Sequence, residues 1–262
     1  MPAVPVPPLL PALAAIPNPR RAFGRRHPLP AVLALSRAAM LAGRDRLLAI
    51  AEWGRDPNAW EPLARRLGFA RNRTPCVTTL HRVSRRLDAA AFERAVGGWA
   101  AEVAAALAAP GDRGGSAMDV KTLRASRRPG VPAVQLLGTL GHGPGLVLAE
   151  VPVDPARGEA AALPELLAGL VPDGRADAAA LLALWRGRWG IENRLHRGGR
   201  DAGFAEDRSA ARVGGVLQAL AATRNTVIAL LRAHGHSRRP PPARPRRERR
   251  PHRLLTARMN RS

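Results

Sequence analysis

Residues 116–153 read SAMDVKTLRASRRPGVPAVQLLGTLGHGPGLVLAEVPV. Three apolar runs lie in this stretch, at residues 116–123, 133–140 and 146–153, and Gly- and Pro-rich turns separate them. Runs of this length between turn residues are typical of strands, and short turns join strands that run antiparallel. The stretch therefore predicts a three-stranded antiparallel meander.

Segments with a helical pattern surround the predicted strands. Apolar residues recur at spacings of three and four between residues 28 and 110, and again in residues 163–170, 178–196 and 213–233. These spacings place apolar side chains along one side of a helix. Helices and an antiparallel sheet in separate parts of one chain predict an α+β fold.

Composition divides the chain into four parts. A Gly-rich loop after residue 110 separates an all-helical unit from the unit that holds the strands. We expect a disordered Pro- and Ala-rich N-terminus over residues 1–15, a helical domain over 16–110, a second domain over 116–235 and a disordered Arg- and Pro-rich tail over 236–262.

The charge is high and unevenly distributed. The 42 basic and 20 acidic residues give a formal net charge of +22. Residues 1–110 and 237–262 each carry +9, whereas residues 111–236 carry only +4. Such a charge favours a polyanionic partner, either nucleic acid or an anionic membrane surface. A GC-rich genome also raises the arginine content, but it would not collect the carboxylates in the middle.

Cysteine use and hydropathy exclude several classes of protein. Cys76 is the only cysteine, so the chain has no internal disulfide and no cysteine-cluster zinc site. The apolar run at residues 29–42 contains Arg37 and is shorter than the about 18–20 residues that a membrane span needs. The N-terminus lacks the basic start of a signal peptide. We expect a cytoplasmic protein without membrane contact.

The segment at residues 74–87 is the best candidate for a DNA-reading helix. Its apolar residues share one face, and the remaining positions include Thr78, Thr79, Arg82, Arg85 and Arg86. With the predicted helix at residues 60–67 it forms a helix-turn-helix-like unit whose polar end meets bases and phosphates. The alternative is an ordinary amphipathic helix with a solvated basic face.

Two carboxylates stand at positions suited to a magnesium site. Asp119 lies in the first predicted strand and Glu192 in the helix predicted over residues 178–196. Carboxylates from different elements bind Mg²⁺, and two such ions activate a water and stabilise a leaving oxygen in phosphoryl transfer. The alternatives are an ion pair of Glu192 with Arg188 on the same helix and an Asp119 side chain bonded to backbone.

Motifs along most of the chain resemble those of the H-repeat-associated group of insertion-sequence DDE transposases. The similar segments, in order, are Ile16-Pro-Asn-Pro-Arg-Arg21, Gly24-Arg-Arg-His-Pro-Leu29, Ala49-Ile-Ala-Glu-Trp53, Thr78-Thr-Leu-His-Arg-Val83, Asp119-Val-Lys-Thr-Leu-Arg124, Trp189-Gly-Ile-Glu-Asn-Arg-Leu-His196, Phe204-Ala-Glu-Asp-Arg-Ser209 and Thr223-Arg-Asn225. Their order and number make the resemblance specific.

The resemblance implies a transposase-associated DNA-binding domain over residues 16–110 and a ribonuclease-H-like catalytic core over residues 116–235. It implies Mg²⁺-dependent cutting and joining of double-stranded DNA at transposon ends, in a bacterial, nucleoid-associated protein that pairs with a second copy or an intact transposase. It assigns catalytic, metal-binding roles to Asp119 and Glu192. Candidate second-shell or phosphate contacts are Lys121, Arg124, Asn193 and His196.

The chain departs from the family pattern before the Glu192 helix. The family places a second catalytic Asp on a fourth strand there, whereas this chain has one short predicted helix and a connector with Asp173 and Asp177. We therefore expect a truncated catalytic domain with impaired catalysis, because two-metal chemistry needs carboxylates that bridge both ions. The alternatives are a non-catalytic DNA-binding protein, a transposition inhibitor and a pseudogene product.

Overall fold

A computed structural model gives the arrangement of the chain, and it describes residues 6–56, 64–69, 73–108, 116–141, 145–170, 204 and 214–236. Its sheet contains β1, Ser116–Thr122, β2, Gln135–Gly141, and β3, Val147–Val153. The strands lie in the order β1-β2-β3 and both neighbouring pairs are antiparallel. The predicted meander is therefore confirmed.

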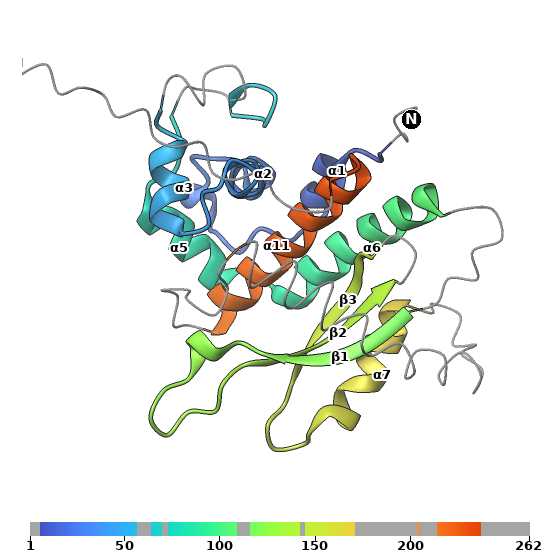
Figure 1. Cartoon of the computed structure of the whole chain (residues 1–262). Coiled ribbons are helices and arrows are strands. Elements are labelled where there is room, and N and C mark those ends of the chain that lie inside the picture. The colour runs from blue at the N-terminus through green and yellow to red at the C-terminus, as the bar shows by residue number, and fades with distance from the viewer. Residues whose placement is uncertain are drawn as a thin grey trace, which may run out of the picture.

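Helices cover both faces of the sheet (Figure 1). On one face lies α7, Glu159–Leu170, where Leu166 packs with Leu137 of β2 and Val151 of β3. On the opposite face lie α6, Ala89–Leu107, and α11, Gly214–Ala233. The sheet buries side chains on both faces, and the α+β prediction is confirmed.

The N-terminal region is helical, as predicted. Helices α2, Leu29–Leu41, α3, Leu47–Trp53, and α5, Val77–Arg86, follow the 3.6-residue pattern of the sequence. Gly43 ends the first of these with a φ of 86°, a backbone conformation that glycine adopts at little cost. The first half of the helix predicted over residues 60–67, residues 60–63, lies outside the described residues.

The first residues depart from expectation. We expected disorder over residues 1–15, but Leu9–Ala14 form helix α1, and Leu13 is fully buried in the core. The indole Nε1 of Trp99 also donates a hydrogen bond of 2.9 Å to the carbonyl oxygen of Pro7. Packing against α2 and α6 therefore fixes a Pro-rich segment, and Pro11 is tolerated because first-turn N–H groups need no helical partner.

One core cluster joins the helical region to the sheet region. It contains Leu13 and Leu35 from the N-terminal helices, Leu140 from β2, and Leu220 and Leu231 from α11. Helix α11 packs against α2, α5 and α6 (Figure 1). The chain thus returns to the helical layer after the sheet. The expected domain boundary near residue 110 stays a prediction.

A buried charge pair lies in the helical layer. Arg37 of α2 is 2% exposed, and its Nη1 donates a hydrogen bond of 2.8 Å to the carbonyl oxygen of Leu33. Its guanidinium carbon lies 5.1 Å from the centroid of the Phe92 ring. Burial lowers the pKa of Arg37 to about 9, and the charge of Glu93 on α6 opposes that shift.

In the part of the chain that the structure describes, no helix has both the length and the apolar character to cross a membrane.

Candidate functional site

A row of three residues crosses the sheet at the predicted catalytic position. Asp119 of β1 is paired with Gly138 of β2, which is paired with Glu150 of β3. Paired residues point to the same face, and neighbouring strands lie about 4.8 Å apart. The structure therefore places a second carboxylate on the Asp119 face, which the sequence analysis did not identify.

Glu150 is buried and held by the helix above it. Its side chain is 3% exposed, and Nδ2 of Asn225 on α11 donates a hydrogen bond of 3.1 Å to its Oε2. A Cβ atom at Gly138 would lie 3.6 Å from Oε1 of Glu150, so the carboxylate extends over this glycine toward β1. Oδ1 of Asn225 is buried and has no hydrogen-bond partner among the described residues.

Lys121 and Arg124 lie on either side of the end of β1. Lys121 is 7% exposed and lies two residues from Asp119, on the same face of the strand. Arg124 lies past the strand in the short 3₁₀ helix η2, Arg124–Ser126, and is exposed. Lys121 is thus a buried positive charge on the face of β1 that also carries Asp119. Arg124, by contrast, lies on the surface.

One predicted catalytic residue and two of the residues predicted to act beside the catalytic carboxylates lie outside the described residues. These are Glu192, Asn193 and His196. Among the residues that the structure does describe, no three His, Cys, Asp or Glu side chains gather closely enough to hold a metal ion. Of the two predicted magnesium ligands, Asp119 is the one that lies in the described part of the chain.

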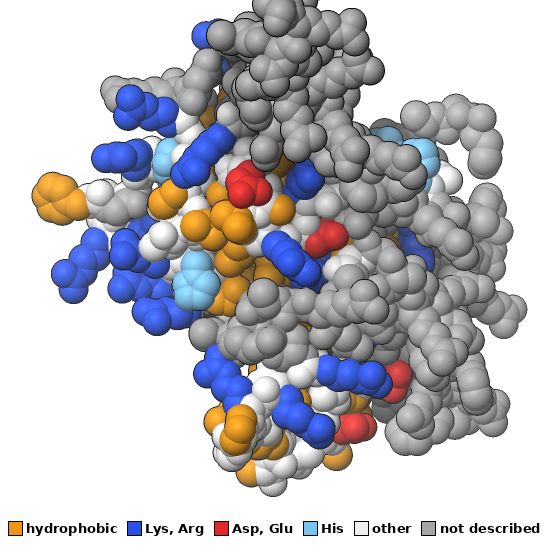
Figure 2. Space-filling view, turned by 60° about the vertical axis from the view of Figure 1, so that its left-hand side comes forward, with side chains coloured by type: hydrophobic (Ala, Val, Ile, Leu, Met, Phe, Trp, Pro, Cys, Tyr) orange, Lys and Arg blue, Asp and Glu red, His pale blue; other side chains and the backbone are white. Residues whose placement is uncertain are grey.

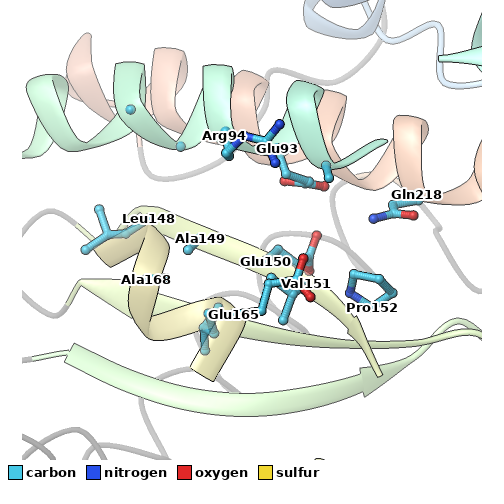
Figure 3. A pocket seen from close by; sticks show the side chains of 14 residues that line it. Glu93, Arg94, Leu148, Ala149, Glu150, Val151, Pro152, Glu165, Ala168 and Gln218 are labelled. Carbon is cyan, nitrogen blue, oxygen red and sulfur yellow. The ribbon is translucent and has the colours of Figure 1, made fainter. Parts of the chain in front are cut away.

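A cavity of about 420 Å³ lies between α6, β3 and α7 (Figure 3). Glu93 and Arg94 line it from α6, Glu150 from β3 and Glu165 from α7. Glu93 and Glu150 approach it from opposite sides, and Gln218 of α11 lies at one end. The cavity thus gives access to the buried Glu150 carboxylate.

Helix α5 has the amphipathic form that its sequence predicts. Leu80 and Val83 are buried. The exposed residues include Thr78, Arg82, Arg85 and Arg86, whereas Thr79 is half-buried. All but one of the candidate DNA contacts on this helix are therefore exposed to solvent. Both interpretations of the helix, as a DNA-reading helix and as an ordinary helix with a solvated basic face, predict this exposure.

Thr79 makes a local contact at the N-terminal end of α5. Its Oγ1 lies 3.3 Å from Sγ of Cys76, the N-cap residue just before the helix, and this contact lowers the pKa of the exposed Cys76 thiol. The Thr79 hydroxyl therefore contacts the residue before the helix, whereas its neighbour Thr78 is exposed to solvent.

Exposed arginines far outnumber exposed carboxylates in the described residues from 6 to 108. The exposed acids are Glu52, Asp56, Asp88 and Glu102. The exposed arginines are Arg21, Arg25, Arg26, Arg46, Arg55, Arg65, Arg66, Arg73, Arg82, Arg85, Arg86 and Arg94. Figure 2 shows basic side chains spread over the side of the molecule formed by α3 and α5. This surface has the charge that binds phosphates.

Comparison with known families identifies the helical region. Residues 10–100 match the family described as DDE_Tnp_1-associated, a class of domain associated with DDE transposases. Over these residues the chain is similar to this transposase-associated family, in agreement with the resemblance found in the sequence. The region contains helix α5 and all twelve exposed arginines.

Two of three similar curated proteins are named as putative transposases. The chain is 34% identical over 164 residues to a Xanthobacter autotrophicus protein named "Uncharacterized protein in dhlA 3'region", covering 60% of this chain and 52% of that one. It is 29% identical over 163 residues to the Escherichia coli K12 protein named "Putative transposase YncI", covering 61% and 62%. A protein of the same name in E. coli O157:H7 is also 29% identical, over 61% of this chain and 40% of its own length. The chain thus spans about half the length of these relatives.

No solved structure matches the chain.

Proposed function

We propose that the chain binds double-stranded DNA at transposon ends through the basic surface of its helical region. The observation that carries this proposal is the set of twelve exposed arginines against three exposed acids, Glu52, Asp56 and Asp88, in the described residues that match the transposase-associated family. Arginine forks bind phosphate oxygens in two hydrogen bonds, and threonine hydroxyls near a helix N-terminus add contacts to the DNA backbone. Thr78, Arg82, Arg85 and Arg86 form the centre of the interface.

The second part of the proposal concerns the sheet. A ribonuclease-H-like core would use Asp119 of β1 with Glu192 for Mg²⁺-dependent cleavage and joining of DNA. The sequence lacks the Asp that the family places on a fourth strand, so we expect this activity to be impaired. Asn193 and His196 would act beside Glu192, and Lys121 and Arg124 beside Asp119.

A non-catalytic DNA-binding protein or a transposition inhibitor is the second candidate function. The missing Asp favours it, and so does the environment of Glu150, the carboxylate nearest to Asp119 in the sheet register: it is bonded to Asn225 under α11. Such a protein would occupy transposon ends alone, as a homo-oligomer or together with an intact transposase, in the nucleoid of a bacterial cytoplasm.

Fluorescence anisotropy with the full chain and a labelled duplex tests the DNA-binding proposal. The variant Arg82→Ala/Arg85→Ala/Arg86→Ala removes three charges from α5. The control Arg127→Ala/Arg128→Ala/Arg157→Ala removes three exposed charges from the loops of the sheet. We expect a large loss of affinity in the first variant and a smaller slope of log K against log salt, because each lost phosphate contact changes that slope by about 0.9. Equal losses in both variants would show that net charge, not α5, governs binding.

Cleavage of transposon-end DNA with Mg²⁺ separates the two candidate functions. Impaired catalysis predicts slow nicking that Asp119→Asn abolishes. Nicking that survives this substitution would exclude Asp119 as a ligand. Binding without any nicking supports the non-catalytic function.

A further inference from the structure

The loop between α1 and α2 presents a fully exposed aromatic side chain. Phe23 lies in the 3₁₀ helix η1, Ala22–Gly24, and has a relative exposure of 106%. Of the other large apolar side chains exposed in the described part of the chain, Leu48 is next at 56%. Transfer of a phenyl ring out of water is favourable in proportion to the area that is buried. Among the described apolar side chains, Phe23 therefore offers the largest stabilisation to a partner that covers it.

Basic side chains flank this ring on both sides. The segment from residue 20 to residue 27 reads Arg-Arg-Ala-Phe-Gly-Arg-Arg-His and contains no carboxylate. Arg21, Arg25 and Arg26 are exposed. A partner that covers Phe23 therefore meets at least three positive charges, and a second copy of this loop is disfavoured because like charges repel.

Hydrogen bonds and the core hold the loop in place. Oδ1 of Asn18 accepts from both N and Nε of Arg20, at 3.2 and 3.1 Å. The backbone oxygen of Arg20 accepts from Nε of Arg25 at 3.1 Å. On either side of the loop, Ile16 and Leu29 are 4% and 2% exposed in the core. The loop is ordered before any partner binds, which lowers the entropic cost of binding.

We propose that Phe23 is a wedge that inserts between adjacent base pairs of double-stranded DNA, while Arg21, Arg25 and Arg26 bind the neighbouring phosphates. This inference rests on the proposed DNA binding. Apolar wedges beside arginines unstack base steps in the minor groove, and the resulting bend brings more protein surface against the duplex. Duplex DNA offers an apolar stack and anionic oxygens at the spacing of adjacent side chains. An anionic membrane offers both as well, but its headgroups do not require the rigid loop seen here.

The test uses the full chain and a mixed-sequence duplex of about three helical turns. Each adenine of its TA steps is replaced by 2-aminopurine, whose fluorescence rises on unstacking. The wild type should bind with a rise in fluorescence. Phe23→Ala should bind about ten-fold more weakly, within the range measured for base–aromatic contacts, and without the rise. Phe23→Leu should retain part of both effects because leucine is also a wedge residue.

Two controls separate the ring from the charges. Leu48→Ala removes another exposed apolar side chain and should change neither affinity nor fluorescence. Arg21→Ala should reduce the salt slope by about one, whereas Phe23→Ala should leave that slope unchanged.

Three outcomes would overturn the inference. If the wild type binds and Phe23→Ala binds equally well with the same fluorescence, the wedge is wrong and the proposed function remains. If the wild type does not bind the duplex, both are wrong. If Phe23→Ala abolishes binding to phosphatidylglycerol vesicles but not to the duplex, the loop contacts a membrane.

Discussion

Asn225 of α11 donates a hydrogen bond of 3.1 Å from Nδ2 to Oε2 of Glu150 on β3, although the two residues are 75 positions apart. Both side chains are buried, at 6% and 3% exposed. The bond therefore connects α11, the last helix of the described residues, to β3, the strand that lies farthest from β1 in the sheet. It also gives the buried carboxylate a polar partner, without which burial would destabilise the charged form.

Replacing this amide by a carboxylate should destabilise the protein strongly. Asn225→Asp places a second acid beside Glu150, and loss of a partner to a buried charge costs about 3–5 kcal/mol. Urea denaturation should show this loss near neutral pH. The deficit should shrink as the pH falls, because one carboxyl of the pair has a raised pKa in the folded state and so takes up a proton that stabilises it.

A double variant supplies the control for that prediction. Glu150→Gln/Asn225→Asp again pairs one amide with one carboxylate, so it should recover most of the lost stability. If both variants are equally unstable, or if the deficit does not depend on pH, the effect is steric and not electrostatic.

Adjacent glycines of α6 should respond in opposite ways to alanine. A Cβ atom at Gly97 would lie 2.6 Å from the backbone oxygen of Leu148, whereas one at Gly98 would meet nothing within 4 Å. Gly97→Ala should therefore force α6 away from β3 and lower the free energy of unfolding. Gly98→Ala should raise it by about 0.5–1 kcal/mol, because alanine is the better helix former. Thermal denaturation of the two variants checks this, and similar melting temperatures would contradict the close packing of α6 on β3.

Arg37 should be held in the core by Glu93. Glu93→Gln removes the opposing charge and should destabilise the protein by about 3 kcal/mol, while Arg37→Met/Glu93→Gln should recover most of that loss. Burial lowers the pKa of Arg37 to about 9, well below its ordinary value, so the folded state binds fewer protons than the unfolded state in the pH range between the two values. The free energy of unfolding should therefore rise with pH above about 9, relative to Arg37→Met. A flat difference between the two proteins in alkaline urea titrations would contradict this.

The sequence predicted the elements whose pattern is local. The strands of the meander follow from apolar runs between Gly- and Pro-rich turns, and α2 from its periodicity and Gly43. Helix α1 was missed because its Pro- and Ala-rich composition resembles that of a disordered start, while its order comes from tertiary contacts of Leu13. Local pattern cannot report such contacts.

The candidate site was predicted only in part for the same reason. Asp119 was identified because a family motif surrounds it. Glu150 and Asn225 come together only when the strands take their register and α11 returns over the sheet. The exposure of Phe23 could not be predicted from the sequence either, since the exposure of a phenylalanine depends on the fold. A basic segment around an aromatic residue is the one sequence feature that could have drawn attention to it.

The thiol of Cys76 should report on the start of α5. The contact with Thr79 lowers the pKa of this exposed thiol. Thr79→Val removes the hydroxyl and should raise that pKa, so alkylation by iodoacetamide near neutral pH should slow because less thiolate is present. Thr78→Val is the matched control, since Thr78 acts on this thiol through its backbone, and its alkylation rate should equal that of the wild type.

The same thiol tests the DNA interface from the side of the protein. Cys76 precedes Thr78 by two residues at the N-terminal end of α5, and both are exposed. A duplex bound to this end of the helix should therefore slow alkylation in the wild type, and added salt should restore the rate as phosphate contacts are lost. Arg82→Ala/Arg85→Ala/Arg86→Ala should show little protection at the same duplex concentration. Full binding by anisotropy with no protection of Cys76 would place the duplex on a different part of the basic surface.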